Sequence, residues 1–288
     1  GGSLFSSGSL KDTIQWERGR GLAATAIRDV ATDPDNPLIA YAAVYVQNEW
    51  SVFRTDDGGE SWVKTALPPI PEPELGDTKQ VVIAKGNGVE ILYAGSNGCG
   101  VFHSLDSGQT WETFGRTECK VESENAPRNV LAMAAAYENP NLLYVAAEST
   151  RFYVSSDRGE EWQTYTLSIT SQIDKIAPDP YLPGHIYLIA GVDGFWRSED
   201  GGRNWVPLSE GLENSALVDL VVVPDRPETL FIAADSGEVR KTTNGGRSWT
   251  SIRENLPLTQ IGALAFDVRT RELWTGSRLG GLFKYQLG

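Results

Sequence analysis

Thr55-Asp56-Asp57-Gly58-Gly59-Glu60-Ser61-Trp62 is the first of five copies of one eight-residue pattern in this chain of 288 residues. The pattern is Ser or Thr, any residue, Asp, any residue, Gly, two further residues and Trp. The other copies span residues 104–111, 155–162, 198–205 and 242–249, and the last has Asn244 in place of Asp. Their tryptophans are 43 to 51 residues apart. A period of this size predicts a repeat architecture.

Each copy lies between two runs of strand-forming residues, such as 50–54 and 62–65 around the first copy. Asp-x-Gly between such runs is typical of a hairpin connection. The glycine supplies a backbone conformation that other residues adopt at a cost, and the polar side chains form hydrogen bonds inside the turn. We therefore interpret the pattern as structural, not as a metal site or catalytic acid. Its residues are Asp57, Asp106, Asp157, Asp200, Asn244, Trp62, Trp111, Trp162, Trp205 and Trp249.

A second set of strand-like runs recurs in step with the first. Each is aligned on one aromatic residue: Tyr41, Tyr93, Tyr144, Tyr187, Phe231 and Trp274. Six such runs accompany five full patterns, and residues 281–285 resemble the strand before a pattern. Residues 13–17 resemble the strand after one, with Trp16 in the tryptophan position. The sequence thus predicts an all-β, six-bladed β-propeller of four-stranded antiparallel blades, closed by an N-terminal strand that completes the last blade.

The five copies resemble the Asp-box, or BNR, repeat. That family includes sialidases, sortilin-type receptors, xyloglucan-cleaving hydrolases and the lumenal photosystem II assembly factor, and all of them are β-propellers. The resemblance covers nearly the whole chain. It implies the fold, but it does not distinguish between an enzyme, a receptor and an assembly factor.

Two enzyme members are compared with these residues. A sialidase would need an arginine triad. The stretch 26–29 does not match the Arg-Ile/Leu-Pro motif with which the sialidase site usually begins. The xyloglucanase-type hydrolases resemble this chain in repeats and in openings such as 33–37, but they typically bind substrate between two propellers. One propeller is present here, so the resemblance does not imply that activity directly.

The composition argues against some classes of binding partner. The formal net charge of −13 opposes binding to nucleic acid phosphates or anionic lipid surfaces. No apolar run is long enough to span a membrane. We expect a flexible Gly/Ser-rich segment at 1–10, one propeller domain at 11–288, a monomeric state, no nucleic acid partner, no membrane insertion, and neither a cofactor nor a metal.

Cys99 and Cys119 are the two cysteines. In the predicted blade, Cys99 lies in the loop between the second and third strands, and Cys119 lies in the connection that leaves the same blade. Both loops emerge on one face, so we predict a disulfide and an extracytoplasmic, oxidising compartment. The alternative is two reduced thiols. Zinc-ligand spacing is absent, since the histidines are His103 and His185 alone.

The face opposite the patterns is the predicted binding face. Two long connections, residues 67–75 and 115–127, flank the second blade on this face. Pro69 and Pro71 belong to a proline-rich, stiff arm in the first of them. Trp50, Arg28 and Arg151 are the further binding candidates. Plain surface insertions are the alternative interpretation of the two connections.

Asp174 and Asp219 open the inner strands of adjacent predicted blades. A glycoside hydrolase uses a pair of carboxylates as its acid and its base or nucleophile. The simpler interpretation is that these acids form ion pairs or are hydrated at the mouth of the channel. Two functions therefore stay open. The first is a non-catalytic, extracytoplasmic recognition or assembly module that binds a protein partner. The alternative is a carbohydrate-active propeller, either a glycoside hydrolase or a lectin, that binds a polysaccharide with these acids.

Overall fold

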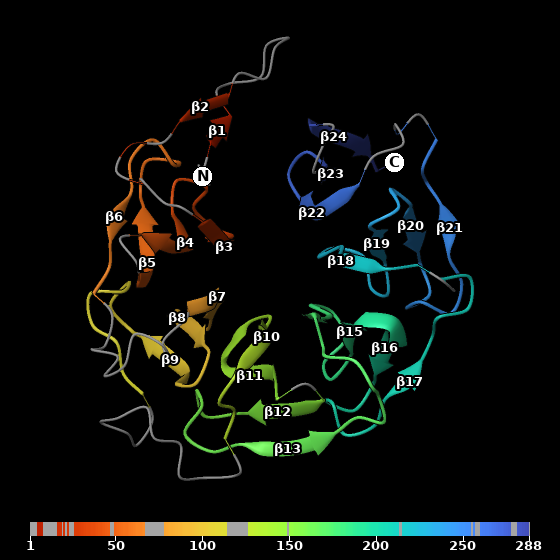
Figure 1. Ribbon diagram of the computed structural model, residues 1–288, viewed down its shortest axis with the longest axis horizontal. Helices are drawn as coiled ribbons and strands as arrows, with labels where there is room; N and C mark the ends of the chain where they lie inside the picture. The colour runs from red at the N-terminus through yellow and green to blue at the C-terminus, as the bar shows by residue number, and fades with distance from the viewer. Residues whose placement is uncertain are drawn as a thin grey trace. The chain divides into compact units, whose positions relative to one another are not determined.

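The structure is a computed structural model. It describes residues 5–7, 16–18, 20, 22, 26–46, 49–66, 78–113, 126–148, 150–212, 215–254, 256, 260–277 and 281–287 (Figure 1). The chain forms two compact units. The first unit comprises residues 1–143 and 155–162, and the second comprises residues 144–154 and 163–288.

The described strands form six sheets in chain order, plus a short N-terminal pair. The first sheet contains β3 (Ala26–Thr32), β4 (Ala40–Val46), β5 (Glu49–Thr55) and β6 (Val63–Lys64). The second contains β7 (Thr78–Gly86), β8 (Val89–Ser96) and β9 (Gly100–Ser104). The third contains β10 (Val130–Ala136), β11 (Asn139–Ala147), β12 (Arg151–Ser155) and β13 (Gln163–Thr166).

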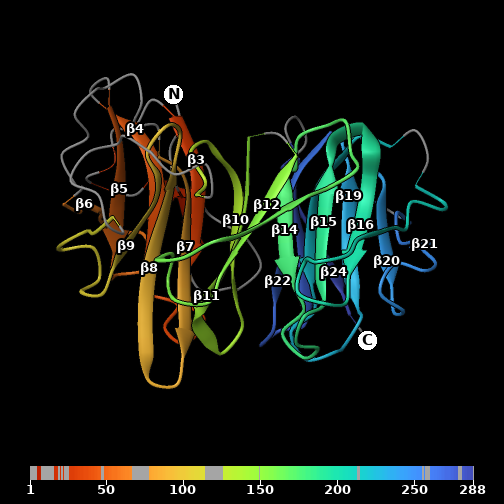
Figure 2. The same ribbon diagram turned by 90° about the horizontal axis from the view of Figure 1, so that it is seen from below.

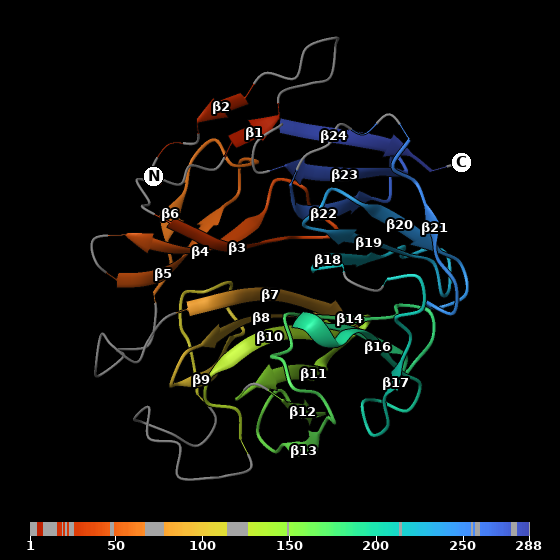
Figure 3. The same ribbon diagram turned by 45° about the vertical axis from the view of Figure 1, so that its right-hand side comes forward.

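The remaining sheets continue the same order. The fourth contains β14 (Lys175–Pro178), β15 (Ile186–Ala190), the 3-10 helix η1 (Gly191–Asp193), β16 (Gly194–Ser198) and β17 (Val206–Pro207). The fifth contains β18 (Leu217–Val222), β19 (Leu230–Ala234), β20 (Val239–Thr242) and β21 (Thr250–Ser251). The sixth contains β22 (Ile261–Asp267), β23 (Glu272–Ser277) and β24 (Gly281–Gln286), which Figure 3 shows side by side.

Tight turns make each sheet an antiparallel meander. The β7–β8 turn is Asn87-Gly88, and both residues have positive φ (53° and 75°), as a two-residue hairpin turn requires. Four sheets have four strands, while the second and sixth have three among the described residues. In the second sheet, an isolated bridge between His103 and Glu112 stands where a fourth strand would pair. The prediction of an all-β, six-bladed β-propeller is confirmed.

The pairing of the N-terminal strand differs from the prediction. β2 (Trp16–Arg18) pairs with β1 (Phe5–Ser7) in a two-stranded sheet. Pairing of residues 13–17 with β24 is not among the pairings of the described part of the chain. A local hairpin closes a much shorter loop than a pairing with the far end of the chain, so its loop-closure entropy cost is smaller.

The second strand of each sheet forms the buried centre. Tyr41, Tyr93, Tyr187 and Phe231 are fully buried on β4, β8, β15 and β19, because these strands have a neighbour on each side and apolar residues on both faces. The pattern tryptophans extend this core. In the second unit, the rings of Trp205 and Trp249 pack edge-on against phenylalanines of the preceding sheet, at centroid distances of 5.0 and 5.2 Å.

The five pattern turns (residues 55–62, 104–111, 155–162, 198–205 and 242–249) repeat one set of hydrogen bonds. In the first turn, the Thr55 hydroxyl donates to Asp57 Oδ1 (2.7 Å) and accepts from the Gly59 amide (2.9 Å). Asp57 Oδ1 also accepts from the Ser61 amide (2.9 Å). In the last turn, the amide oxygen of Asn244 accepts the equivalent bonds at 2.8 and 3.0 Å. These side chains therefore bond within their own turns.

These bonds predict a loss of stability in acid. Hydrogen bonds from the hydroxyl and amide of Ser61 lower the pKa of Asp57 from 3.8 to about 2, and the equivalent bonds from Thr110 do the same for Asp106. Because the folded-state pKa is depressed, this stabilisation is present above pH 4 or so and is lost as the pH falls towards 2. Urea unfolding across that window should show a weaker pH dependence in an Asp57→Asn, Asp106→Asn variant. An unchanged slope would contradict the assignment.

Candidate functional site

Asp219, one of the two predicted hydrolase carboxylates, is a buried anchor. A register shift between Leu217 and Asp219 marks a β-bulge at the start of β18, and bulges redirect side chains. Asp219 Oδ1 accepts from the Leu220 amide (2.9 Å) and lies 2.8 Å from Lys175 Nζ. Its Oδ2 accepts from the amide of Leu264 on β22 (2.8 Å). Both oxygens are engaged, so Asp219 joins the first strands of two neighbouring sheets.

The first unit repeats this arrangement with Asp29. A bulge between Ile27 and Asp29 precedes it on β3. Asp29 Oδ1 accepts from the Val30 amide (3.0 Å), and Oδ2 accepts from the amide of Val81 on β7 (3.1 Å). The recurrence of one geometry in both units indicates that this aspartate position holds adjacent sheets together.

Asp174, the second predicted carboxylate, anchors a loop. Its Oδ2 accepts from the Gly191 amide at the start of η1 (3.0 Å), and its Oδ1 accepts from the side-chain amide of Gln172 (2.7 Å). One bond fixes the connection between β15 and β16, and the other fixes the segment that enters β14. Asp174 thus organises backbone at the loop end of the fourth sheet.

η1 is held from its other side as well. Asp193 Oδ2 accepts from the amides of Thr170 (2.8 Å) and Ser171 (2.7 Å), and the Trp196 indole donates to the Asp193 carbonyl (2.9 Å). The Val192 amide donates to the Ser171 hydroxyl (3.2 Å). The Val192 side chain is nevertheless 93% exposed. An apolar side chain is therefore presented to solvent on a loop with fixed geometry.

A second cluster lies at the loop end of the first sheet, within the first unit. The Arg28 guanidinium lies over the Trp50 ring, 5.4 Å from its centroid. The Tyr45 ring lies on β4, directly opposite Trp50, at a centroid distance of 5.2 Å. Trp50 is half-buried and Arg28 is exposed. The sequence named Trp50 and Arg28 separately as binding residues, and the structure brings them together.

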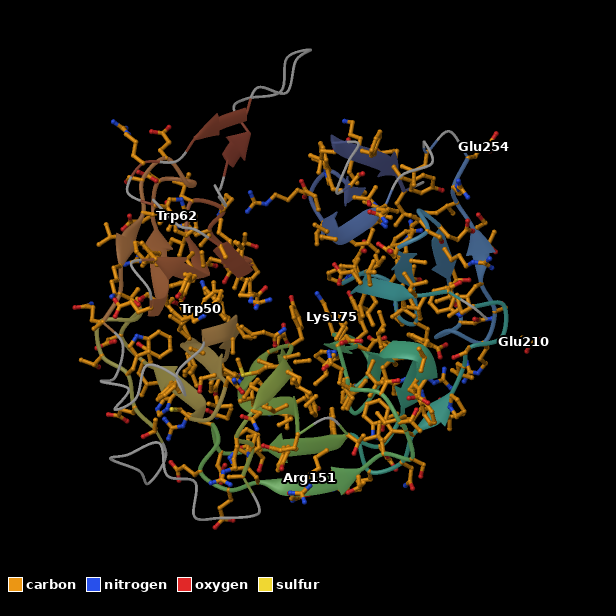
Figure 4. The ribbon with its side chains drawn as sticks, in the orientation of Figure 1. Trp50, Trp62, Arg151, Lys175, Glu210 and Glu254 are labelled. Atoms are coloured by element: carbon orange, nitrogen blue, oxygen red, sulfur yellow. The ribbon has the colours of Figure 1, made fainter. Side chains whose placement is uncertain are left out.

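The other predicted site residues belong to neither of these clusters or lie outside the described residues. Arg151 is exposed at the start of β12, opposite Thr166 of β13 (Figure 4). Pro69, Pro71 and Cys119 lie outside the described residues. Cys99 is buried in the core of the second sheet, and because Cys119 lies outside the described residues, the Cys99–Cys119 bridge stays a prediction.

Sequence reasoning missed Val192, Asp193 and Tyr45. The signal for the first two was present, since Gly191-Val192-Asp193-Gly194 places an apolar residue between turn-forming residues shortly after the strand-like run aligned on Tyr187. Figure 4 shows Trp50 and Lys175, each within its own unit.

In the part of the chain that the structure describes, no group of three His, Cys, Asp or Glu side chains is placed to hold a metal ion. The described residues also contain no helix of the length and apolarity needed to cross a bilayer.

Comparison with protein-family models gives no match. Among curated proteins, the xyloglucanase Xgh74A of Acetivibrio thermocellus is 24% identical over 284 residues, which cover 79% of this chain and 32% of the xyloglucanase. The photosystem II assembly protein Ycf48 of Thermosynechococcus vestitus is 23% identical over 181 residues, which cover 62% of this chain and 48% of that protein. The chain thus spans about a third of the xyloglucanase and about half of the assembly protein.

Solved structures show the same fold. YCF48 bound to a D1 peptide has a TM-score of 0.67 at 16% identity, with 95% of this chain and 82% of that chain covered. An ancestral GH74 enzyme has a TM-score of 0.69 at 18% identity, with 92% of this chain and 37% of the enzyme covered. The chain is therefore similar in fold to propeller proteins of two kinds, an assembly protein and a group of xyloglucan-cleaving enzymes.

Proposed function

We propose that this chain is a non-catalytic recognition module that binds a protein partner through the loop ends of its sheets, opposite the pattern turns. The observation that carries the proposal is Val192, an apolar side chain that is 93% exposed on a loop fixed by Asp174 and Asp193. A loop that is already ordered loses little entropy when a partner binds. The fold likeness to YCF48, whose structure contains a D1 peptide, supports a protein as the partner.

Trp50 and Arg28 extend this proposal to the first unit. Tryptophan and arginine are enriched among the residues that dominate binding energy at protein interfaces. Trp50 packs against both Tyr45 and Arg28, so its ring is oriented before any partner arrives. We assign both residues to partner contact.

A carbohydrate-active propeller is the second candidate, favoured by the half-buried Trp50 ring and by the similarity to xyloglucanases. The hydrogen bonding of the two predicted carboxylates argues against this candidate. Asp219 and Asp174 both accept hydrogen bonds from backbone amides, so both carboxylates already have a structural role in this fold.

Val192→Asp should reduce partner capture roughly tenfold or more, because a charge would enter an interface that excludes water. Immobilised wild-type protein and variants are exposed to an extracytoplasmic extract of the source organism, and the retained proteins are quantified by mass spectrometry. Val206→Asp is the matched control, since Val206 is an exposed valine on β17 at the outer edge of the same sheet. Equal retention by both variants would argue against the proposed surface.

Incubation with xyloglucan tests the hydrolase form of the second candidate, since a lectin would bind the polysaccharide without cleaving it. We expect no release of reducing ends by the wild-type protein. Release that is abolished in Asp174→Asn, with the fold intact by circular dichroism, would instead establish the carbohydrate-active alternative.

An extracytoplasmic location is part of the proposal, and it would be supported by the Cys99–Cys119 bridge, which is itself a proposal. The bridge would close a loop of about 20 residues and add on the order of 3 kcal/mol to the free energy of unfolding. Thiol titration of the denatured chain, with and without a reductant, checks this. Free thiols in the unreduced protein would remove the support.

A further inference from the structure

Four large apolar side chains are exposed at the pattern-turn end of the first unit, opposite the loop end. Leu38 precedes β4, Val89 and Tyr137 lie at the β7–β8 and β10–β11 turns, and Leu105 follows β9. Their exposed fractions are 52%, 46%, 59% and 55%, respectively. Figure 2 shows the β7–β8 and β10–β11 turns at the same end of this unit. These four residues are named the turn-end patch.

Hydrogen bonds join two of the turns that carry the patch. The Asn87 side chain donates to the Glu138 carbonyl (3.2 Å), and a Cβ at Gly86 would lie 2.1 Å from that carbonyl oxygen. The β7–β8 and β10–β11 turns are therefore in direct contact. The Leu38 carbonyl accepts from the Gly58 amide of the first pattern turn (2.9 Å).

Lys85 ties the first sheet to the second at this end. Its ammonium group lies 2.6 Å from Asp33, 3.5 Å from Asp35 and 3.1 Å from Glu90. The loops beneath Leu38 and Val89 are thus connected through one cation. Backbone that is ordered in this way can bind a partner without a large entropy cost.

Carboxylates outnumber basic groups at the same end of the first unit. The side chains of Asp35 and Asp56 are 77% and 70% exposed. The acids at this end are Asp33, Asp35, Asp56, Asp57, Glu60, Glu90, Asp106, Glu138, Asp157, Glu160 and Glu161, against the bases Arg20, Arg54, Lys85 and Arg158. Lys85, Arg54 and Arg158 already lie within 4.0 Å of carboxylates. The face therefore combines exposed apolar groups with excess negative charge.

We propose that the turn-end patch is a second docking surface, which binds a partner-protein segment carrying lysine or arginine beside apolar side chains. The basic groups complement the acids at this end, and the apolar groups cover Leu38, Val89, Leu105 and Tyr137. A second copy of this chain does not fit, because its net charge of −13 would repel the same face. The surface is distinct from the loop-end surface that carries Val192.

The test uses three short fluorescent peptides of equal length, one with arginine and leucine, one with arginine and serine, and one with glutamate and leucine. Fluorescence anisotropy with the full chain should give a Kd for the first peptide that is roughly tenfold or more below the other two. Leu38→Ser and Tyr137→Ser should each weaken that binding several-fold, and high salt should weaken it further.

Val206→Ser is the control, because it removes an exposed valine on β17 of the second unit, outside both proposed surfaces, and should leave the peptide Kd unchanged. Thermal unfolding checks that all three variants fold. Equal binding of the arginine–leucine and arginine–serine peptides would overturn the proposal, as would no binding or no effect of Leu38→Ser and Tyr137→Ser. None of these results bears on the loop-end surface, which the capture experiment with Val192→Asp tests.

Discussion

Gly202→Ala is expected to lower the free energy of unfolding by roughly 2–4 kcal/mol. A Cβ at this position would lie 2.3 Å from Cε1 of Phe152, a fully buried ring that packs edge-on against Trp205. Relief requires movement of Phe152 or of the turn backbone, and the close-packed surroundings oppose both. Gly202 also has a φ of +90°, which adds backbone strain for alanine. Urea denaturation of the purified variant measures the difference.

Gly201→Ala isolates the contribution of the contact. Gly201 also has a positive φ (+73°), but nothing lies within 4 Å of the Cβ that alanine would add. Its expected cost is backbone strain alone, about 1 kcal/mol. The prediction is contradicted when the two variants unfold at the same urea concentration, because the contact with Phe152 would then carry no penalty.

Asp219→Ala is expected to lower the free energy of unfolding by roughly 2–5 kcal/mol, since each buried donor left unpaired costs about 1–3 kcal/mol. The substitution removes the acceptor of the Leu220 and Leu264 amides and the partner of Lys175. Asp219→Asn should fall between the wild type and Asp219→Ala, because one amide oxygen replaces two carboxylate oxygens. Chemical denaturation monitored by tryptophan fluorescence provides the measurement.

Asp225→Ala is the matched control for Asp219→Ala. Asp225 pairs with Arg271 at the surface of the second unit, and its side chain is 37% exposed. Exposed ion pairs contribute between zero and about 1 kcal/mol, so this variant should stay close to the wild type. Should Asp219→Ala prove equally mild, Asp219 would not be a structural anchor, and its role as a catalytic acid would have to be considered again.

Local chemistry made the fold predictable. Turn residues at fixed offsets, such as Asp57 and Gly59, make their hydrogen bonds within the same turn, so the pattern of residue types carries all of the information. The second strands are likewise mostly apolar runs, as burial on both faces of a strand requires. The pairing of residues 16–18 was less predictable, because β1 and β24 are competing partners for one short strand and local pattern does not rank them.

The candidate site was predicted only in part, and Asp174 and Asp219 give the reason. In the sequence, two acidic residues at the starts of adjacent inner strands fit a catalytic role and a structural role equally well. Their partners include backbone amides: Gly191 for Asp174, and Leu264, 45 residues away, for Asp219. Backbone amides carry no sequence signal, so these bonds depend on the bulge and on the register of neighbouring sheets.

The sequence by itself determined the turns, the strands and the number of sheets, because each of these is decided by interactions within one repeat. Only the tertiary structure decided which side chains bond or pack within the fold and which are exposed to solvent. It engaged both carboxylates, placed Arg28 over Trp50, and left Val192 exposed to solvent. The bonds from Asp219 to Leu264 and from Asp174 to Gly191 join segments that are apart in the chain, so the geometry of packing, not the identity of the residue, determines the partner.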